Sequence, residues 1–218
     1  MNIIYENQNI VVCQKEIGEN SEKSASNPSL ANKVEQKYGY AGVIHRLDTN
    51  VGGAIVYAKN KKAAAKFSQL VADGNLCKEY LAVVEGIPKE SEVLNDYLFK
   101  DSSKNKVFVV KKLRKGVKEA SLEYNLLGTV YDNDKPLSLV KIKLHTGRSH
   151  QIRVQFSSRK MPLLGDGKYG SKCNKCTVSL WSYFLNCKDP FSGDDLCIKS
   201  LPPKENYPWN LFNYNSLQ

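Results

Sequence analysis

The 218-residue sequence has no apolar run near the roughly 18 residues that a membrane-spanning helix needs. Its first six residues, Met-Asn-Ile-Ile-Tyr-Glu, lack the basic and apolar regions of a secretory signal peptide. No segment recurs at intervals of 20–50 residues, which argues against solenoids and propellers. With 41% hydrophobic and 25% charged residues, the chain has the composition of a soluble globular protein. These features predict a cytoplasmic protein.

Cysteine is present but gives no sign of a disulfide framework. The six cysteines are scattered in a chain long enough to build a hydrophobic core, so we expect free thiols. Cys173 and Cys176 have the spacing of half a zinc knuckle, and Cys187 and Cys197 are available to complete four ligands. The later pair lies in strand-like segments without knuckle spacing, so thiols are favoured over structural zinc.

Acidic residues are too few to balance the basic ones. There are 32 Lys and Arg against 22 Asp and Glu, a net charge of +10, which suits a polyanionic partner. Residues 100–118 hold eight basic residues and one acid. Such a run is equally typical of a solvated surface, so alone it leaves nucleic-acid binding open. Its candidate phosphate contacts are Lys111, Lys112, Arg114 and Lys115.

Hydrophobic patterning predicts more strands than helices. The clearest helix begins after Asn60, a good N-cap, and ends near Gly74. We expect two shorter helices, over residues 30–38 and over 149–158 with Ser149 as its cap. The polar stretch 19–31 predicts a mobile loop, and the tail from 202 to 218 predicts a surface segment. Expected strands cover residues 1–5, 9–14, 54–58, 77–85, 120–130, 137–144, 180–187 and 196–199.

These elements predict the α+β class, with a mixed, largely antiparallel central sheet flanked by helices. The polar residues 131–136 predict a hairpin turn between the two longest strands. We expect one domain over residues 1–218.

One polar cluster interrupts an apolar stretch, His45-Arg46-Leu47-Asp48, and a pair of glycines follows it. The pattern places an arginine and a carboxylate in a loop at the end of a strand, where catalytic residues are often found. Asp48 and the glycines are also typical of an ordinary turn. This stretch alone leaves both interpretations open.

Three further stretches decide between them. These are residues 78–86 (Lys-Glu-Tyr-Leu-Ala-Val-Val-Glu-Gly), 144–153 (Leu-His-Thr-Gly-Arg-Ser-His-Gln-Ile-Arg) and 165–170 (Gly-Asp-Gly-Lys-Tyr-Gly). Together with residues 45–48, and in this order, they resemble the RluA family of RNA pseudouridine synthases. The resemblance extends from about residue 3 to residue 208.

The resemblance implies a pseudouridine synthase fold without an N-terminal S4-type domain, and specific residue roles. Asp48 corresponds to the catalytic aspartate, Tyr80 to the tyrosine that packs against the target base, and Arg153 to the basic partner of Asp48. Arg46 corresponds to the arginine that helps displace the target nucleotide. We also expect Arg148, His150 and Gln151 to shape the site or contact RNA. The family further implies ribosomal or transfer RNA as partner, a monomer, and no cofactor or metal.

The sequence departs from the family pattern at three places. Val51-Gly52-Gly53 stands where Thr-Ser-Gly is usual, and Lys15-Glu16-Ile17-Gly18 lacks the usual proline. Gln155 replaces a usual histidine. Because Asp48, Tyr80 and Arg153 are retained, we expect activity, with rate and substrate choice left open.

Two other functional classes are compatible with parts of the sequence. Three histidines and Asp48 suggest a metal hydrolase, but His145 and His150 are five residues apart, whereas two ligands on one helical face are four apart. A non-catalytic RNA-binding protein on the same scaffold would explain the charge without chemistry. Retention of all three proposed catalytic residues favours the enzyme.

Overall fold

The computed structural model describes residues 1–214, which fold into two compact units. Unit 1 contains Met1–Glu79 and Trp181–Pro202. Unit 2 contains Tyr80–Leu180 and the segment that begins at Pro203. The chain therefore passes between the units three times, twice within a strand.

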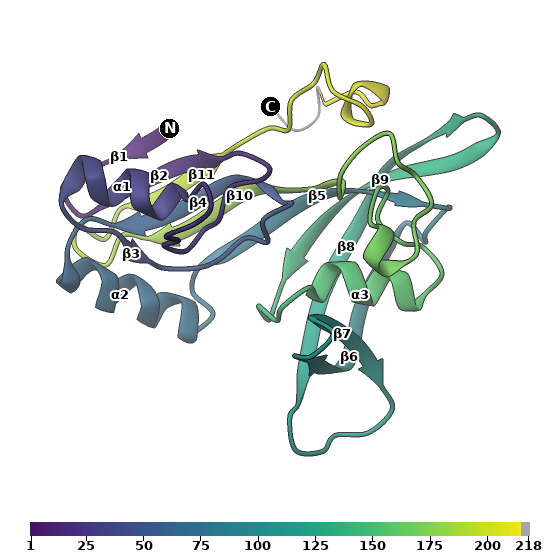
Figure 1. Cartoon of the computed structure of the whole chain (residues 1–218), viewed down its shortest axis with the longest axis horizontal. Helices are drawn as coiled ribbons and strands as arrows, with labels where there is room; N and C mark the ends of the chain where they lie inside the picture. The colour runs from purple at the N-terminus through teal and green to yellow at the C-terminus, as the bar shows by residue number, and fades with distance from the viewer. Residues whose placement is uncertain (215–218) are drawn as a thin grey trace. The chain divides into compact units, whose positions relative to one another are not determined.

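Unit 1 is built on a sheet with the strand order β1-β2-β4-β10, in which β11 pairs with β10 and β3 pairs with β4 (Figure 1). The pairing is antiparallel except between β4 and β10, which run parallel at Trp181↔Gly52 and Ser182↔Gly53. The strands are β1 (Asn2–Glu6), β2 (Ile10–Lys15), β3 (Gly42–Val43), β4 (Gly52–Ala58), β10 (Leu180–Lys188) and β11 (Asp195–Lys199).

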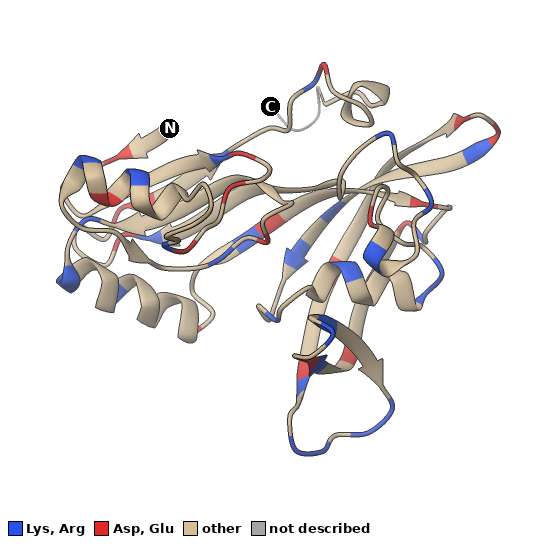
Figure 2. Cartoon of the chain, viewed as in Figure 1, with Lys and Arg blue, Asp and Glu red and all other residues tan. Residues whose placement is uncertain are grey.

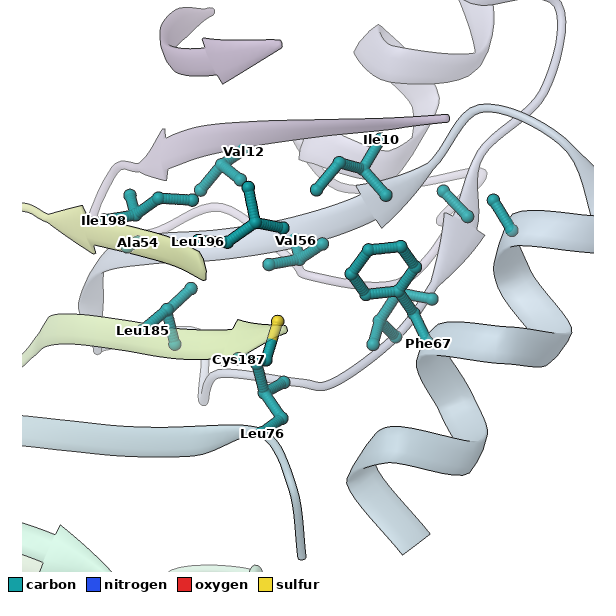
Figure 3. Packing of buried hydrophobic residues seen from close by; sticks show 13 residues of the cluster. Ile10, Val12, Ala54, Val56, Phe67, Leu76, Leu185, Cys187, Leu196 and Ile198 are labelled. Atoms are coloured by element: carbon teal, nitrogen blue, oxygen red, sulfur yellow. The ribbon is translucent and has the colours of Figure 1, made fainter. Parts of the chain in front are cut away.

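The helices of unit 1 cover the sheet because its strands are apolar on both faces. One face packs against α2 (Lys61–Ala72), whose Phe67 lies among Ile10, Val56 and Leu185 (Figure 3). Alternation turns Tyr57 to the other face, where its hydroxyl donates to the carbonyl of Ser21 at 2.8 Å. The segment that leads into α1 (Leu30–Tyr38) therefore covers that face.

Unit 2 contains a second set of strands in the order β5-β9-β8-β6-β7, in which β9, β8, β6 and β7 pair antiparallel. The hairpin β8–β9 turns at Asn133 and Asp134, which have φ values of 48° and 60°, as a two-residue turn of type I′ requires. The elements are β5 (Cys77–Glu85), β6 (Ser91–Asp101), β7 (Lys106–Val110), β8 (Val117–Asp132), β9 (Lys135–Leu144), α3 (Gln151–Ser158), η1 (Gly167–Tyr169) and η2 (Trp209–Leu211).

The predicted α+β class with largely antiparallel pairing is confirmed. Both helices of unit 1 are confirmed. Helix α2 is capped by the expected Asn60, and the structure adds Ser29 as the cap of α1. Among the described residues, no helix is long and apolar enough to cross a membrane.

Strands β6 and β7 were not predicted, and the predicted N-cap of α3 is wrong. The basic stretch contains the end of β6 and all of β7, because the Val and Phe of residues 107–110 pair with β6. The N-cap of α3 is His150, in the left-handed region at φ 50°, and not Ser149. The tail was predicted to be a surface segment. It belongs to unit 2 and contributes two buried side chains, Trp209 and Tyr214. Residues 215–218 of that prediction lie outside the described residues.

Candidate active site

The loop that carries Asp48 is held in place by backbone contacts on both sides of that residue. The Ser21 hydroxyl donates to the Leu47 carbonyl at 2.7 Å and accepts from the Leu47 N–H at 2.9 Å. The Thr49 carbonyl accepts from the Gly18 N–H at 2.8 Å, and the Asp48 carbonyl accepts from the Val51 N–H at 2.9 Å. Each bond has an ordinary length, and together they fix the backbone on either side of the carboxylate.

Lys15 is the central residue of this arrangement. It is fully buried at the end of β2, and its ammonium donates to the carbonyls of Glu16, Glu19 and Thr49 at 2.8, 2.8 and 3.1 Å. An ammonium has three N–H groups, so all three are used. Burial lowers the pKa of Lys15 to about 8, although Glu19 and Asp48 act in the opposite direction. Sequence analysis noted Lys15 only as part of a motif and missed this role.

The stretch 19–31, expected to be a mobile loop, is anchored to unit 1 near both of its ends. Glu19, Ser21 and Ser29 are all buried, and the Asn20 N–H donates to the Pro28 carbonyl at 2.8 Å. The serines are used internally, since Ser21 bonds Leu47 and Ser29 caps α1. These hydroxyls form hydrogen bonds to backbone groups and not to water, which polar composition alone does not reveal.

His45 is a buried structural residue next to the Asp48 loop. Its Nε2 accepts from the Val56 N–H at 3.2 Å, and its Nδ1 is buried without a hydrogen-bond partner among residues 1–214. Burial, with a smaller contribution from the positive charge of Lys78, lowers the pKa of His45 to about 3. The ring is therefore neutral at physiological pH and anchors the loop to β4.

Arg46 points to solvent and forms an ion pair with Glu22, with Nη1 and Oε2 2.9 Å apart. Both side chains are about 60% exposed. An exposed pair of this kind contributes little to stability and exchanges readily for another anion. Arg46 is thus available to bind a phosphate group.

The departure at Val51-Gly52-Gly53 has a steric cause within unit 1. A Cβ at Gly52 would lie 2.3 Å from the Trp181 ring, so that ring fills the space of the usual side chain. Gly53 has φ 111°, and a Cβ there would lie 2.3 Å from the Ser182 carbonyl oxygen. The close approach of β10 therefore requires both glycines.

The other two predicted catalytic residues are buried in unit 2. Tyr80 is 6% exposed on β5, where residues 80–84 are all buried. Arg153 is 6% exposed on α3 and forms a bidentate pair with Asp166, whose oxygens lie 2.6 Å from Nε and 2.8 Å from Nη2. Such fork-like pairs fix the guanidinium plane. The pairing of Arg153 with Asp48 stays a prediction.

Tyr169 supports Arg153 from the adjoining turn. The guanidinium carbon lies 5.1 Å from the centre of the Tyr169 ring, a cation–π contact. The Tyr169 hydroxyl accepts from the Val107 N–H at 2.9 Å and lies 2.8 Å from His150 Nδ1. Sequence analysis quoted residues 165–170 as a motif but assigned roles to neither Asp166 nor Tyr169.

The three residues at the start of α3 differ in what they can contact. Gln151 is buried, with its amide donating to the Ser121 carbonyl and accepting from Thr146 Oγ1 and the Arg148 N–H, so it shapes the preceding loop. Arg148 is exposed and donates to the Glu119 carbonyl. His150 is partly buried against Tyr169.

The predicted phosphate contacts lie together on an exposed loop of unit 2. Lys111, Lys112, Arg114 and Lys115 connect β7 to β8 and are all exposed, with no acid between residues 106 and 118 (Figure 2). Arg114 lies over the Phe99 ring at 5.6 Å. Their exposure agrees with a role in binding a polyanion.

The remaining departures and metal candidates have structural explanations. Gln155 is fully buried and donates to the Leu94 carbonyl and to Asp96, so it ties α3 to β6. The six cysteines are free thiols. Within residues 1–214, no three or more His, Cys, Asp or Glu side chains form a group suited to a metal ion.

Comparison with known proteins identifies the family. The family model described as RNA pseudouridylate synthase matches residues 9–158, a span that includes Asp48, Tyr80 and Arg153. The chain therefore belongs to the RNA pseudouridylate synthases, and the resemblance to the RluA family is confirmed.

Two relatives show how far the similarity extends. The chain is 33% identical over 199 residues to an uncharacterized RNA pseudouridine synthase of Aquifex aeolicus, covering 86% of this chain and 61% of the relative. It is 32% identical over 200 residues to ribosomal large subunit pseudouridine synthase D of Borreliella burgdorferi, with 84% and 60% covered. The chain thus spans about three fifths of the length of these relatives.

Solved structures share the fold. Human RNA pseudouridylate synthase domain containing 1 superposes with a TM-score of 0.78 at 22% identity, covering 93% of this chain and 83% of the human one. At this identity the likeness concerns the fold alone.

Proposed function

We propose that this protein is an RNA pseudouridine synthase that isomerises uridine in ribosomal or transfer RNA, acting as a single catalytic domain. Asp48 is the catalytic aspartate, Tyr80 packs against the target base, and Arg153 is the basic partner. The observation that carries the proposal is the bracing of the Asp48 loop, because a loop fixed by Ser21, Lys15 and Gly18 presents its carboxylate in a defined position.

The chemistry explains why such residues are needed. The reaction breaks the bond between N1 of the base and C1′ of the ribose and forms one between C5 and C1′, with no net gain or loss of atoms. An anionic carboxylate beside the sugar and a nearby cation suit this exchange. An aromatic side chain holds the detached base while it turns. The nucleotide must leave its stack, which is least costly in loops and bulges.

Binding residues follow from exposure. Arg46, Arg148, Lys111, Lys112, Arg114 and Lys115 are exposed and contact RNA phosphates, whereas Gln151 and His150 act by shaping the site. We expect the protein to act in the cytoplasm as a monomer. The isomerase class is that of intramolecular group transfer.

The test uses total RNA from a strain that lacks the gene. Purified protein is incubated with this RNA, and pseudouridine is mapped by chemical labelling and sequencing. Asp48→Asn is the inactive variant, and Asp134→Asn is the matched control, because Asp134 lies at an exposed hairpin tip whose backbone suits asparagine.

New sites with wild type and with Asp134→Asn, but none with Asp48→Asn, support the enzyme and name its RNA. Salt-dependent RNA binding without any modification refutes it and favours a non-catalytic RNA-binding protein.

A further inference from the structure

A groove of about 430 Å³ lies in unit 2 between the outer edge of β7, helix α3 and the turn η1. Lys106, Phe108, Ser158, Lys168 and Tyr169 are among its lining residues. Its volume falls in the range of ~300–1,000 Å³ typical of ligand sites. The groove is separate from the exposed loop of residues 111–116, to which β7 leads.

The lining has the positive charge that a nucleotide requires, and its edge strand carries an exposed aromatic ring. It includes two lysines and no Asp or Glu. Phe108 is 37% exposed, an unusual state for phenylalanine, and Lys106 Nζ lies 5.8 Å from its ring centre. Lys168 is exposed and donates to the Asn105 carbonyl at 2.8 Å. An exposed aromatic ring beside cations is the arrangement that binds unpaired bases and their phosphates.

The backbone of β7 adds hydrogen-bonding groups to one wall. Strand β7 is the last in the order of its sheet and pairs only with β6. Its Val107 N–H donates to the Tyr169 hydroxyl, away from β6. In an antiparallel ladder, residues two apart present their backbone groups to the same side, so Val109 presents its N–H and C=O to the groove.

We propose that this groove binds an unpaired nucleotide of the RNA substrate, with its base on Phe108 and its phosphate at Lys106 and Lys168. The inference rests on the proposed function, because it assumes that RNA is the substrate. Strand β7, which forms one wall of the groove, leads directly into residues 111–115, which are already expected to bind RNA. Charge complementarity favours RNA over an uncharged partner.

Tyr169 connects the groove to Arg153. Its hydroxyl bonds β7 through Val107 and approaches His150 at the start of α3. Its ring lies under the Arg153 guanidinium, and Lys106 Nζ lies 5.3 Å from the centre of the same ring. Tyr169 is therefore a positioning residue through which a nucleotide in the groove orients Arg153.

Binding is measured by fluorescence anisotropy with a labelled oligouridylate, over a range of salt concentrations. Phe108→Ala is expected to weaken binding about 5- to 100-fold, as the loss of one stacked base does. The double variant Lys106→Gln/Lys168→Gln is expected to reduce the salt slope by about 1.4, for two phosphate contacts with a single strand. The matched control is Lys61→Gln/Lys62→Gln, on the exposed side of α2 in unit 1.

If Phe108→Ala and Lys106→Gln/Lys168→Gln both keep the wild-type affinity and salt slope, the proposal that the groove binds a nucleotide is overturned. Displacement of the oligouridylate by a polyglutamate peptide of equal charge would also overturn it, since that indicates a site for acidic peptides. Wild-type pseudouridine formation is measured in parallel. Its absence refutes the proposed function, whereas its presence with unaffected groove variants refutes this inference alone.

The link to Arg153 is tested with Tyr169→Phe, which keeps the ring and removes the hydroxyl. We expect unchanged oligouridylate affinity, with turnover at saturating RNA reduced about tenfold and KM unchanged. Thermal unfolding above the assay temperature verifies that the variant is folded. Unchanged turnover would overturn the link.

Discussion

Replacing Lys15 by methionine distinguishes the effect of Lys15 on the stability of unit 1 from its effect on the order of the Asp48 loop. The substitution keeps an unbranched side chain that is one heavy atom shorter, and it removes three hydrogen bonds to carbonyls. The Thr49 carbonyl retains the Gly18 N–H at 2.8 Å, and the Glu16 carbonyl retains only a 3.4 Å contact from the Glu19 N–H. The main loss is therefore at Glu19.

Two contributions to the unfolding free energy of Lys15→Met have opposite signs. An unsatisfied buried carbonyl costs about 1–3 kcal/mol. The same substitution removes a buried ammonium whose pKa lies at about 8 instead of 10.5, and 2.5 pKa units correspond to ~3 kcal/mol. The net change in unfolding free energy at neutral pH is thus within about 2 kcal/mol. Turnover is expected to fall ~10- to 100-fold, because a loosened loop misplaces Asp48.

The pH dependence is the sharper test. Since the folded-state pKa of Lys15 lies below the unfolded value, the unfolded chain binds more protons between pH 8 and 10.5, and stability rises with pH in that window. The raised pKa values of Cys13 and Cys187, about 12 and 11, act oppositely above pH 9. Subtracting the curve of Lys15→Met from that of wild type removes these contributions.

Urea unfolding at pH 7.5, 9 and 10.5 measures the difference. We expect the wild-type advantage over Lys15→Met to grow by about 3 kcal/mol across this range. Lys33→Met is the control, because Lys33 pairs with the same Glu19 from the protein surface. A difference that stays flat within about 1 kcal/mol, or full turnover in a folded Lys15→Met, would refute the reasoning.

Three further predictions concern single contacts. Asp166→Ala leaves Arg153 buried without its bidentate partner and is expected to cost about 3–5 kcal/mol in urea unfolding; a loss below 1 kcal/mol would contradict the importance of that pair. Gly52→Ala forces a Cβ against Trp181 and is expected to cost about 1–3 kcal/mol, visible as a lower thermal midpoint. Arg46→Ala is expected to change unfolding free energy by less than about 0.5 kcal/mol while weakening RNA binding; unchanged RNA affinity would count against Arg46 as a phosphate contact.

Local signals made much of the fold predictable. Helix α2 follows from an N-cap at Asn60 and a glycine at Gly74, whose φ is 73°, and both signals lie within the segment itself. The turn at Asn133 and Asp134 is equally local. Strand β7 was missed because Lys106 and the lysines on either side of the strand obscure a short apolar run that is stabilised by pairing with β6.

The site was predictable only in part, for a related reason. Motif resemblance proposes Asp48, Tyr80 and Arg153 as site residues, but it gave no role to the residues that hold them. Lys15 acts on Thr49 across 34 positions of sequence, and Ser21 acts on Leu47 across 26. Contacts between residues so far apart in the sequence produce no periodic pattern. A serine that supports a buried loop therefore cannot be distinguished by sequence from a serine in a flexible linker.

The discontinuity of unit 1 has a consequence for how the protein is made. About 100 residues separate Glu79 from Trp181, and a ribosome needs ~5–20 s to add them. During that interval β4 has no β10 beside it, and the apolar cluster around Phe67 lacks Leu185, Cys187, Leu196 and Ile198. The nascent chain therefore carries an open strand edge and an uncovered apolar surface until residue 202 has emerged. Over that period the first half of the chain is a natural client for chaperones.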